Sequence, residues 1–166
     1  MNLPQVCVAY LIRDGAEGQE VLLGRKRKGL GFGNWVGLGG KLESGESVAE
    51  AATREIFEES SLRVIQEDLI EVGTLHYYFP TKPTWSQHST VFLCRRWTGV
   101  AAASDELIPA WFPIDQMPYD EMWEDAKSWL PAVLSGGRVS AHVTFGADLK
   151  TVVDATFASD RRSAAN

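Results

Sequence analysis

Three glutamates that could hold a divalent cation follow a glycine-rich segment in the first half of the chain. Glu55, Glu58 and Glu59 are spaced i, i+3 and i+4, which on an α-helix places them within an arc of roughly 100°. Like charges at this spacing repel unless a cation joins them. Oxygen ligands suit Mg²⁺ or Mn²⁺ and not zinc. The spacing therefore favours a metal site for phosphate chemistry, although glutamates alone are also common on solvated helix faces.

The residues around these glutamates strengthen the metal interpretation. Gly39 or Gly40 can bring a backbone carbonyl close to a metal because no side chain intervenes. Arg54 can orient a loop carboxylate such as Glu46. Residues 25–28 form a short basic run, which is either a solvated strand edge or a phosphate-binding group.

The helix that carries the glutamates has clear signals for its start. Ser47 is expected as the N-cap, with Glu50 at the capping-box spacing. The buried stripe of this helix should be Val48, Ala51, Ala52 and Ile56. A second helix is expected from about Asp125 to Leu134, although Pro131 weakens its last turn.

Strands are predicted where apolar and β-branched residues run between turn residues. The expected strands are residues 6–13, 20–26, 69–79, 90–97, 139–145 and 151–157, with a short apolar piece at 35–38. The first two and the last two should form hairpins. This mixture predicts an α+β sandwich, a single domain over residues 1–158 followed by a frayed tail at 159–166.

Composition bounds the class of protein. The chain has 166 residues, of which 45% are hydrophobic and 23% charged, typical of a globular protein outside the membrane. A net charge of −6 argues against binding a nucleic-acid polymer. No apolar run approaches the roughly 20 residues that span a bilayer. Cys7 and Cys94 lie in apolar segments, so buried free thiols in the cytoplasm are expected over a disulfide.

The segment from Gly40 to Leu62 resembles the Nudix signature: a glycine, five residues, a glutamate, seven residues, then Arg-Glu-apolar-x-Glu-Glu-x-Gly-apolar. The matching residues are Gly40, Glu46, Arg54, Glu55, Ile56, Glu58, Glu59 and Leu62. Ser61 departs from it, because the signature has a glycine that normally takes a left-handed conformation at the helix end. Serine adopts that conformation at modest cost, so we expect a small loss of stability without loss of catalysis.

The resemblance extends to the MutT-homologue group of oxidised purine nucleoside triphosphatases over nearly the whole chain. The matching pieces are Val21 to Gly24, Gly31-x-Gly-x-Trp35, Gly37-x-Gly39-Gly40-Lys41, Asp105-Glu106, Trp111-Phe112, Asp115 to Pro118 and Met122-Trp123-x-Asp125. The resemblance implies a Nudix αβα sandwich with a mixed central sheet. It also implies a monomeric, Mg²⁺-dependent enzyme, with Mn²⁺ possible, that cleaves a nucleoside triphosphate such as 8-oxo-dGTP to monophosphate and pyrophosphate.

The resemblance also implies roles for individual residues. It gives a metal set of Gly39, Glu55, Glu58, Glu59 and Glu106, of which Glu106 is nominated by the resemblance alone. Glu59 is the expected general base, with Glu55 as the alternative, and Arg54 completes the catalytic set. The expected substrate-binding residues are Lys26, Val36, Leu38, Gly39, Gly40, Lys41, His76, Tyr78, Trp123 and Asp125.

Base recognition is where the chain departs from the group. Trp123 is expected to stack on the base rather than serve only as core, and Asp125 to bind the base edge. The group has a second aspartate where this chain has Ala126, and an asparagine where it has Val36. The preferred base is therefore open. His76 and Tyr78 are expected in the pocket wall.

Other histidines and loops are interpreted more simply. His88 and His142 are expected to be surface residues or satisfied polar groups, and the three histidines share no metal-ligand spacing. Residues 80–87 are either a lid or a hairpin loop.

Two alternative functions remain. One is a related hydrolase of another substrate, such as an unmodified or methylated nucleoside triphosphate, a dinucleoside polyphosphate or ADP-ribose. The other is a non-catalytic nucleotide sensor, which the retained glutamates disfavour.

Overall fold

One long strand, β1 (Gln5–Gly15), organises the molecule, whose computed structural model describes residues 2–158. Its first half pairs with β4 (Leu38–Lys41) on one side and runs parallel to β6 (Gln87–Cys94) on the other. Its second half forms the expected hairpin with β2 (Gly18–Lys26). The strand therefore joins two parts of one sheet, and it places β4 against the following helix.

The remaining strands extend this sheet in both directions, in the order β3-β2-β1-β6-β5-β8-β9, with β4 paired to β1 and β7 to β2. Parallel pairing of β1 with β6 and of β5 with β8 makes the sheet mixed, as predicted. The predicted closing hairpin is β8 with β9. The bounds are β3 (Trp35–Val36), β5 (Leu69–Tyr78), β7 (Leu107–Pro113), β8 (Val139–Phe145) and β9 (Val152–Phe157).

The strand β7 is absent from the sequence prediction. Its segment contains Pro109 and Pro113, and proline argues against a strand because it donates no hydrogen bond. Both prolines are tolerated here because β7 pairs with β2 alone. β7 is thus an edge strand of the sheet.

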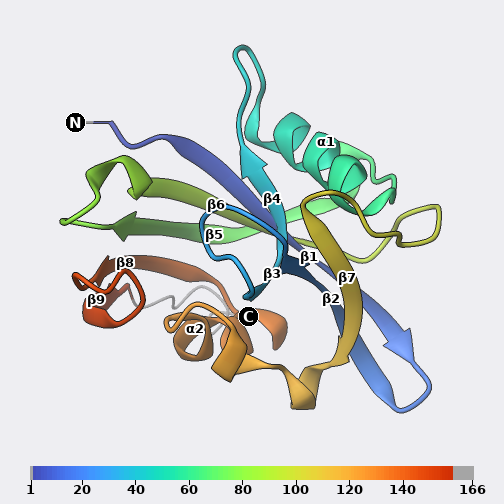
Figure 1. Ribbon diagram of the computed structural model, residues 1–166. Helices are drawn as coiled ribbons and strands as arrows, with labels where there is room; N and C mark the ends of the chain where they lie inside the picture. Colours follow the sequence, from blue (N-terminus) through green and yellow to red (C-terminus); the bar gives the residue numbers. More distant parts are fainter. Residues whose placement is uncertain (1, 159–166) are drawn as a thin grey trace.

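Two α-helices cover opposite faces of the sheet, as the predicted αβα sandwich requires. Figure 1 shows α1 (Val48–Ser60) above the strands and α2 (Ala126–Leu134) below them. Separate apolar clusters fill the two interfaces. Short 3₁₀ turns occupy Gln66–Asp68, Pro83–Trp85, Ile114–Gln116 and Tyr119–Glu121. No helix within residues 2–158 is long and apolar enough to cross a membrane.

The helix α1 begins and ends as its sequence predicts. The Ser47 hydroxyl accepts from the Glu50 backbone N–H, and the Glu50 carboxylate accepts from the Ser47 N–H, which completes the capping box. Ala52 and Ile56 are fully buried. At the other end Ser61 takes the left-handed conformation, with φ of 68°. The expected frayed tail at 159–166 lies outside the described residues.

Cys7 and Cys94 are buried free thiols, as expected.

The segment between β5 and β6 is an ordered hairpin connection. Within it, Lys82 lies 3.9 Å above the ring of Trp85, and Phe79 packs edge-on against that ring.

All three histidines of the chain stack in one row across β6, β5 and β8. The ring centroids of His76 and His88 are 4.3 Å apart, as are those of His76 and His142. Cross-strand register produces this row, because His88 is opposite His76 and His76 is opposite His142. The Tyr78 hydroxyl lies 3.1 Å from Nδ1 of His142. Burial and the two neighbouring imidazoles lower the pKa of His76.

This row makes stability depend on pH. A histidine with a lowered pKa binds fewer protons in the folded state than in the unfolded state, so its contribution is present above about pH 6.5 and is lost as pH falls. The groups facing His76 are His88 from β6 and His142 from β8, with Tyr78 beyond. His76→Phe keeps a stacked ring but cannot be protonated. Between pH 8 and pH 5 its Tm should fall less than that of the wild type, by about 2–4 °C. Equal losses would contradict this account.

Candidate active site

The strand β4 brings two glycines, Gly39 and Gly40, against the glutamates of α1. The Gly39 N–H donates to Oε1 of Glu59 at 2.9 Å. A Cβ on Gly39 would lie 1.9 Å from the Cys7 carbonyl oxygen, and a Cβ on Gly40 would lie 1.7 Å from Oε2 of Glu55. Both positions therefore require glycine, because any side chain would collide with the strand or with a carboxylate.

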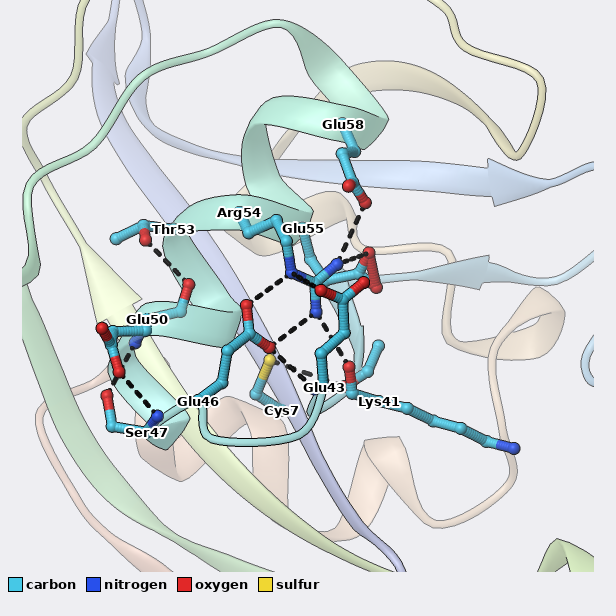
Figure 2. A network of polar contacts seen from close by, with 11 residues as sticks. Cys7, Lys41, Glu43, Glu46, Ser47, Glu50, Thr53, Arg54, Glu55 and Glu58 are labelled. Carbon is cyan, nitrogen blue, oxygen red and sulfur yellow. Dashed lines mark hydrogen bonds and ion pairs between the residues drawn. The ribbon is translucent and has the colours of Figure 1, made fainter.

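Arg54 connects the loop to the helix, as predicted. Its Nε and Nη2 donate to the two carboxylate oxygens of Glu46 at 2.6 and 2.9 Å, and Nη2 also donates to the Lys41 carbonyl at 3.0 Å. Nη1 lies 3.2 Å from Glu55 and 3.1 Å from Glu58 (Figure 2). The guanidinium holds the pKa of Glu46 at about 2. One side chain thus fixes a loop carboxylate and two helix carboxylates.

The carboxylates on the inner side of α1 are crowded and poorly solvated. Glu59 is only 4% exposed, and burial raises its pKa to about 8, with Glu55 and Glu106 adding to the rise. Burial and the adjacent Glu58 raise the pKa of Glu55 to about 7, and Glu106 again contributes. Glu106, far away in the sequence, therefore shares the electrostatic environment of the helix glutamates. Such a set of carboxylate oxygens fits a hard divalent cation, whose charge would remove this repulsion.

These carboxylates lie in one region without forming a ready-made coordination sphere. Within residues 2–158, no three carboxylate, imidazole or thiolate ligands converge closely enough to hold an ion. Arg54 instead binds Glu55 and Glu58, and the Gly39 amide binds Glu59. The predicted metal set is therefore assembled in part, and its coordination remains a prediction.

A cavity of about 260 Å³ opens beside the Glu59 carboxylate. It extends from Gly39 and Gly40 of β4 to Trp129 of α2 and Trp123 in the segment before that helix. Predicted site residues in its lining are Lys26, Val36, Gly39, Gly40, Lys41, Glu59 and Trp123. Ala126, which the sequence comparison named as a departure at the base site, also lines the cavity. Further lining residues that the sequence prediction missed include Tyr10, Leu75, Tyr77, Met122 and Trp129.

Four predicted substrate-binding residues do not line the cavity: Leu38, His76, Tyr78 and Asp125, the last of which lies directly behind the lining. Leu38 is fully buried in the apolar cluster beneath α1. His76 and Tyr78 do not line the cavity, because β5 presents Leu75 and Tyr77 to it and successive side chains of a strand point to opposite faces. The residues of β5 that line this cavity are therefore the immediate neighbours of the two that were expected in the pocket wall. Alternation along the strand places Leu75 and Tyr77 on one face and His76 and Tyr78 on the other, but only the packing of β5 shows which face meets the cavity.

Trp123 is both a packing residue and a cavity residue. Its ring packs edge-on against Phe79 and Phe145, at centroid distances of 5.9 and 5.3 Å. A Cβ on Gly31 would lie 3.2 Å from its Nε1, so the glycine-rich loop closes over the indole. The two interpretations of this tryptophan, core and ligand stacking, are therefore compatible.

Asp125 lies behind the cavity lining and is 2% exposed. Its Oδ2 accepts from the Tyr77 hydroxyl and from Nε1 of Trp129, each at 2.7 Å. Its Oδ1 is buried and has no hydrogen-bond partner among the described residues. Burial raises the pKa of this carboxyl, while its two donors oppose the rise. An unpaired oxygen of this kind is suited to accept from a ligand.

The basic run at 25–28 can be interpreted either as a solvated strand edge or as a phosphate-binding group, and its residues differ in which of these they fit. Lys26 lines the cavity, near Glu59. Arg25 pairs with Glu121 at 3.2 Å, and Arg27 donates to the Ser104 carbonyl at 2.8 Å. Only Lys26 among these three is placed to meet a phosphate in the cavity.

Comparison with solved structures first defines the fold class. A MutT protein from Bacillus halodurans superimposes with a TM-score of 0.77, covering 93% of this chain and 97% of that one at 24% identity. A bifunctional NMN adenylyltransferase/ADP ribose pyrophosphatase from Francisella tularensis, complexed with AMP and a manganese ion, has a TM-score of 0.61 and 22% identity, covering 81% of this chain and 42% of that one. The protein thus has the MutT-like α/β fold.

Sequence comparison then gives the family. The NUDIX domain model matches residues 2–133. The oxidized purine nucleoside triphosphate hydrolase of Danio rerio is 38% identical over 125 residues, covering 75% of this chain and 78% of the relative. The chain belongs to the Nudix family and is a hydrolase. Members of this family generally use divalent metal ions.

Proposed function

We propose that the protein is a Mg²⁺-dependent pyrophosphohydrolase that cleaves oxidised purine deoxynucleoside triphosphates, such as 8-oxo-dGTP, to monophosphate and pyrophosphate. The observation that carries the proposal is the cavity itself, which has Lys26 and Glu59 among its lining residues together with the aromatic Trp123. Phosphates and a flat base could then be bound together. The name of the Danio rerio relative supports the same substrate class.

The carboxylates of α1 and Glu106 would hold the metal, together with the Gly39 backbone. When bound, a divalent ion neutralises phosphate oxygens and lowers the pKa of a water molecule. Glu59 takes the proton of the attacking water, with Glu55 as the alternative base. Arg54 acts as a positioning residue through Glu46, and Lys26 neutralises phosphate charge. Manganese could replace magnesium at an all-oxygen site.

The base would lie against Trp123, with Asp125 behind it as an acceptor. Val36 and Ala126 supply no polar group to this part of the cavity, so fewer hydrogen bonds are available to the base edge. Leu38, His76 and Tyr78 have no part in this proposal.

The test is a substrate panel with Mg²⁺ that contains 8-oxo-dGTP, unmodified and methylated nucleoside triphosphates, dinucleoside polyphosphates and ADP-ribose. The nucleotide products of each substrate are separated and quantified, and pyrophosphate is measured in addition for the triphosphates. We expect kcat/KM to be highest for 8-oxo-dGTP. A tenfold or greater preference for an unmodified nucleotide would overturn the sanitising role. Binding without any turnover would instead favour a nucleotide sensor.

The working form of the protein is proposed to be a monomer in the cytoplasm, with residues 1–158 acting as one domain. Free buried thiols at Cys7 and Cys94 suit a reducing compartment. The net charge of −6 suits a small-molecule substrate better than a nucleic-acid polymer or an anionic membrane.

A further inference from the structure

The carboxylate of Asp125 is held in an unusual way for its position. Asp125 is the N-cap residue of α2, where an aspartate normally accepts from the first backbone N–H groups of the helix. Its side chain makes no such capping bond. It turns instead toward Tyr77 on β5 and Trp129 on α2, which both donate to the same oxygen, Oδ2. Both donors line the cavity.

This arrangement leaves one oxygen of Asp125 for a ligand. Oδ1 is buried and has no partner among residues 2–158, a costly condition unless a ligand donor completes it. The residue that follows, Ala126, lines the cavity with a methyl group, so no second carboxylate is present there to share a proton. Asp125 is therefore a single acceptor directly behind the cavity lining, and its orientation is fixed by Tyr77 and Trp129, two residues of that lining.

We propose that Tyr77 is a positioning residue which, with Trp129, presents the free Oδ1 of Asp125 to the base, and that the cavity consequently selects a guanine-type edge over an adenine-type edge. This inference rests on the proposed function and specifies its substrate class. The guanine-type edge offers adjacent N–H donors at N1 and N2. The adenine-type edge has an acceptor, the ring nitrogen N1, beside its amino group. The lone pair of N1 would face Oδ1, so two acceptors would repel each other.

The wild type should hydrolyse 8-oxo-dGTP with a kcat/KM about tenfold or more above that for 8-oxo-dATP, because the two share the oxidised ring and differ in the edge. Tyr77→Phe removes one donor and should lower this ratio about three- to tenfold through KM, with kcat within twofold. Tyr78→Phe is the matched control, since it removes a hydroxyl on the opposite face, and it should leave the ratio unchanged. An unchanged ratio in folded Tyr77→Phe would overturn the inference.

Asp125→Asn gives a second, sharper test. Because Tyr77 and Trp129 both donate, the amide oxygen should take the place of Oδ2 and the NH₂ group should face the cavity. A donor then replaces the acceptor, so the preference should shift toward 8-oxo-dATP by more than tenfold. A retained preference for 8-oxo-dGTP would contradict the proposed geometry.

The pH dependence of KM distinguishes positioning from simple packing. KM for 8-oxo-dGTP should rise as pH falls and Asp125 takes up a proton, and Tyr77→Phe should move this rise to higher pH because a donor to the carboxylate is lost. The titratable groups near Asp125 are Tyr10 from β1, Tyr77 from β5 and the adjacent Glu124. An identical pH profile in the variant would count against the role of Tyr77.

Binding of monophosphates separates this inference from the proposed function. Calorimetry with 8-oxo-dGMP and 8-oxo-dAMP reports base preference without any hydrolysis. A wild type that hydrolyses neither triphosphate but binds 8-oxo-dGMP about tenfold more tightly would refute the proposed function and support the inference. Equal Kd values for the two monophosphates, with rapid hydrolysis of both triphosphates, would support the proposed function and refute the inference.

Discussion

Replacing Glu59 with glutamine is expected to lower kcat by about 10²–10⁴-fold, the usual contribution of a general base, while the protein stays folded. The substitution keeps the shape of the side chain, and the amide oxygen can still accept from the Gly39 N–H, which lies 2.9 Å from Oε1 in the wild type. What is lost is the ability to take a proton and to bind a cation. The measurement is steady-state release of pyrophosphate from 8-oxo-dGTP over a range of Mg²⁺ concentrations.

Glu50→Gln is the matched control for this variant. Glu50 lies on the same helix, but its carboxylate accepts only within the capping box, where glutamine serves equally well. Its kcat and Tm should remain close to those of the wild type. Because Glu59 is buried, Glu59→Gln removes a carboxyl group whose ionisation is costly, and its Tm without metal should be no lower than that of the wild type. A kcat for Glu59→Gln near the wild-type value would assign the base to another residue, with Glu55 next in line.

Arg54→Lys is expected to lower kcat/KM by about 10- to 100-fold and to raise the Mg²⁺ concentration needed for half-maximal activity. Lysine keeps the charge but lacks the planar fork that binds both oxygens of Glu46. It also cannot reach Glu55 and Glu58 at the same time, so the helix carboxylates lose their common partner. We also expect the free energy of unfolding to fall by about 1–3 kcal/mol. Denaturant unfolding measures this fall independently of activity.

The control for Arg54→Lys is Arg13→Lys. Arg13 also pairs with a glutamate, Glu20, at 2.7 Å, but this pair lies on an exposed hairpin far along the sheet. Exposed pairs contribute little to stability, so the control should change neither kcat/KM nor the metal requirement. If Arg54→Lys matched this control in metal titrations, Arg54 would be a purely structural residue.

Much of the helix that carries the carboxylates was predictable from local sequence. The Ser47 capping box, the buried stripe through Ala52 and Ile56, and the left-handed Ser61 all follow from interactions within a few residues. The pairing of Arg54 with Glu46 was predictable for the same reason. The strand β7 was not, because its prolines mask an edge strand whose position depends on β2.

The residues on the aromatic side of the cavity were harder to predict from local sequence. Alternation along β5 predicts two faces but does not say which face meets the cavity, so it does not distinguish His76 and Tyr78, which the resemblance implies, from Leu75 and Tyr77, which line the cavity. The partners of Asp125 lie on different elements, which only the packing of α2 on the sheet brings together.

By itself, the sequence determined the family signature, the mixed α/β architecture and the carboxylate helix, because helix caps and residue periodicity act over short distances along the chain. Only the tertiary structure decided that Glu106 shares the environment of Glu55 and Glu59, that three histidines stack in one row, and that Asp125 keeps one oxygen free. These arrangements depend on strand register and on helix packing across long sequence separations. A shift of one residue in the register of β5 would turn Tyr77 away from the cavity and remove the donor that orients Asp125.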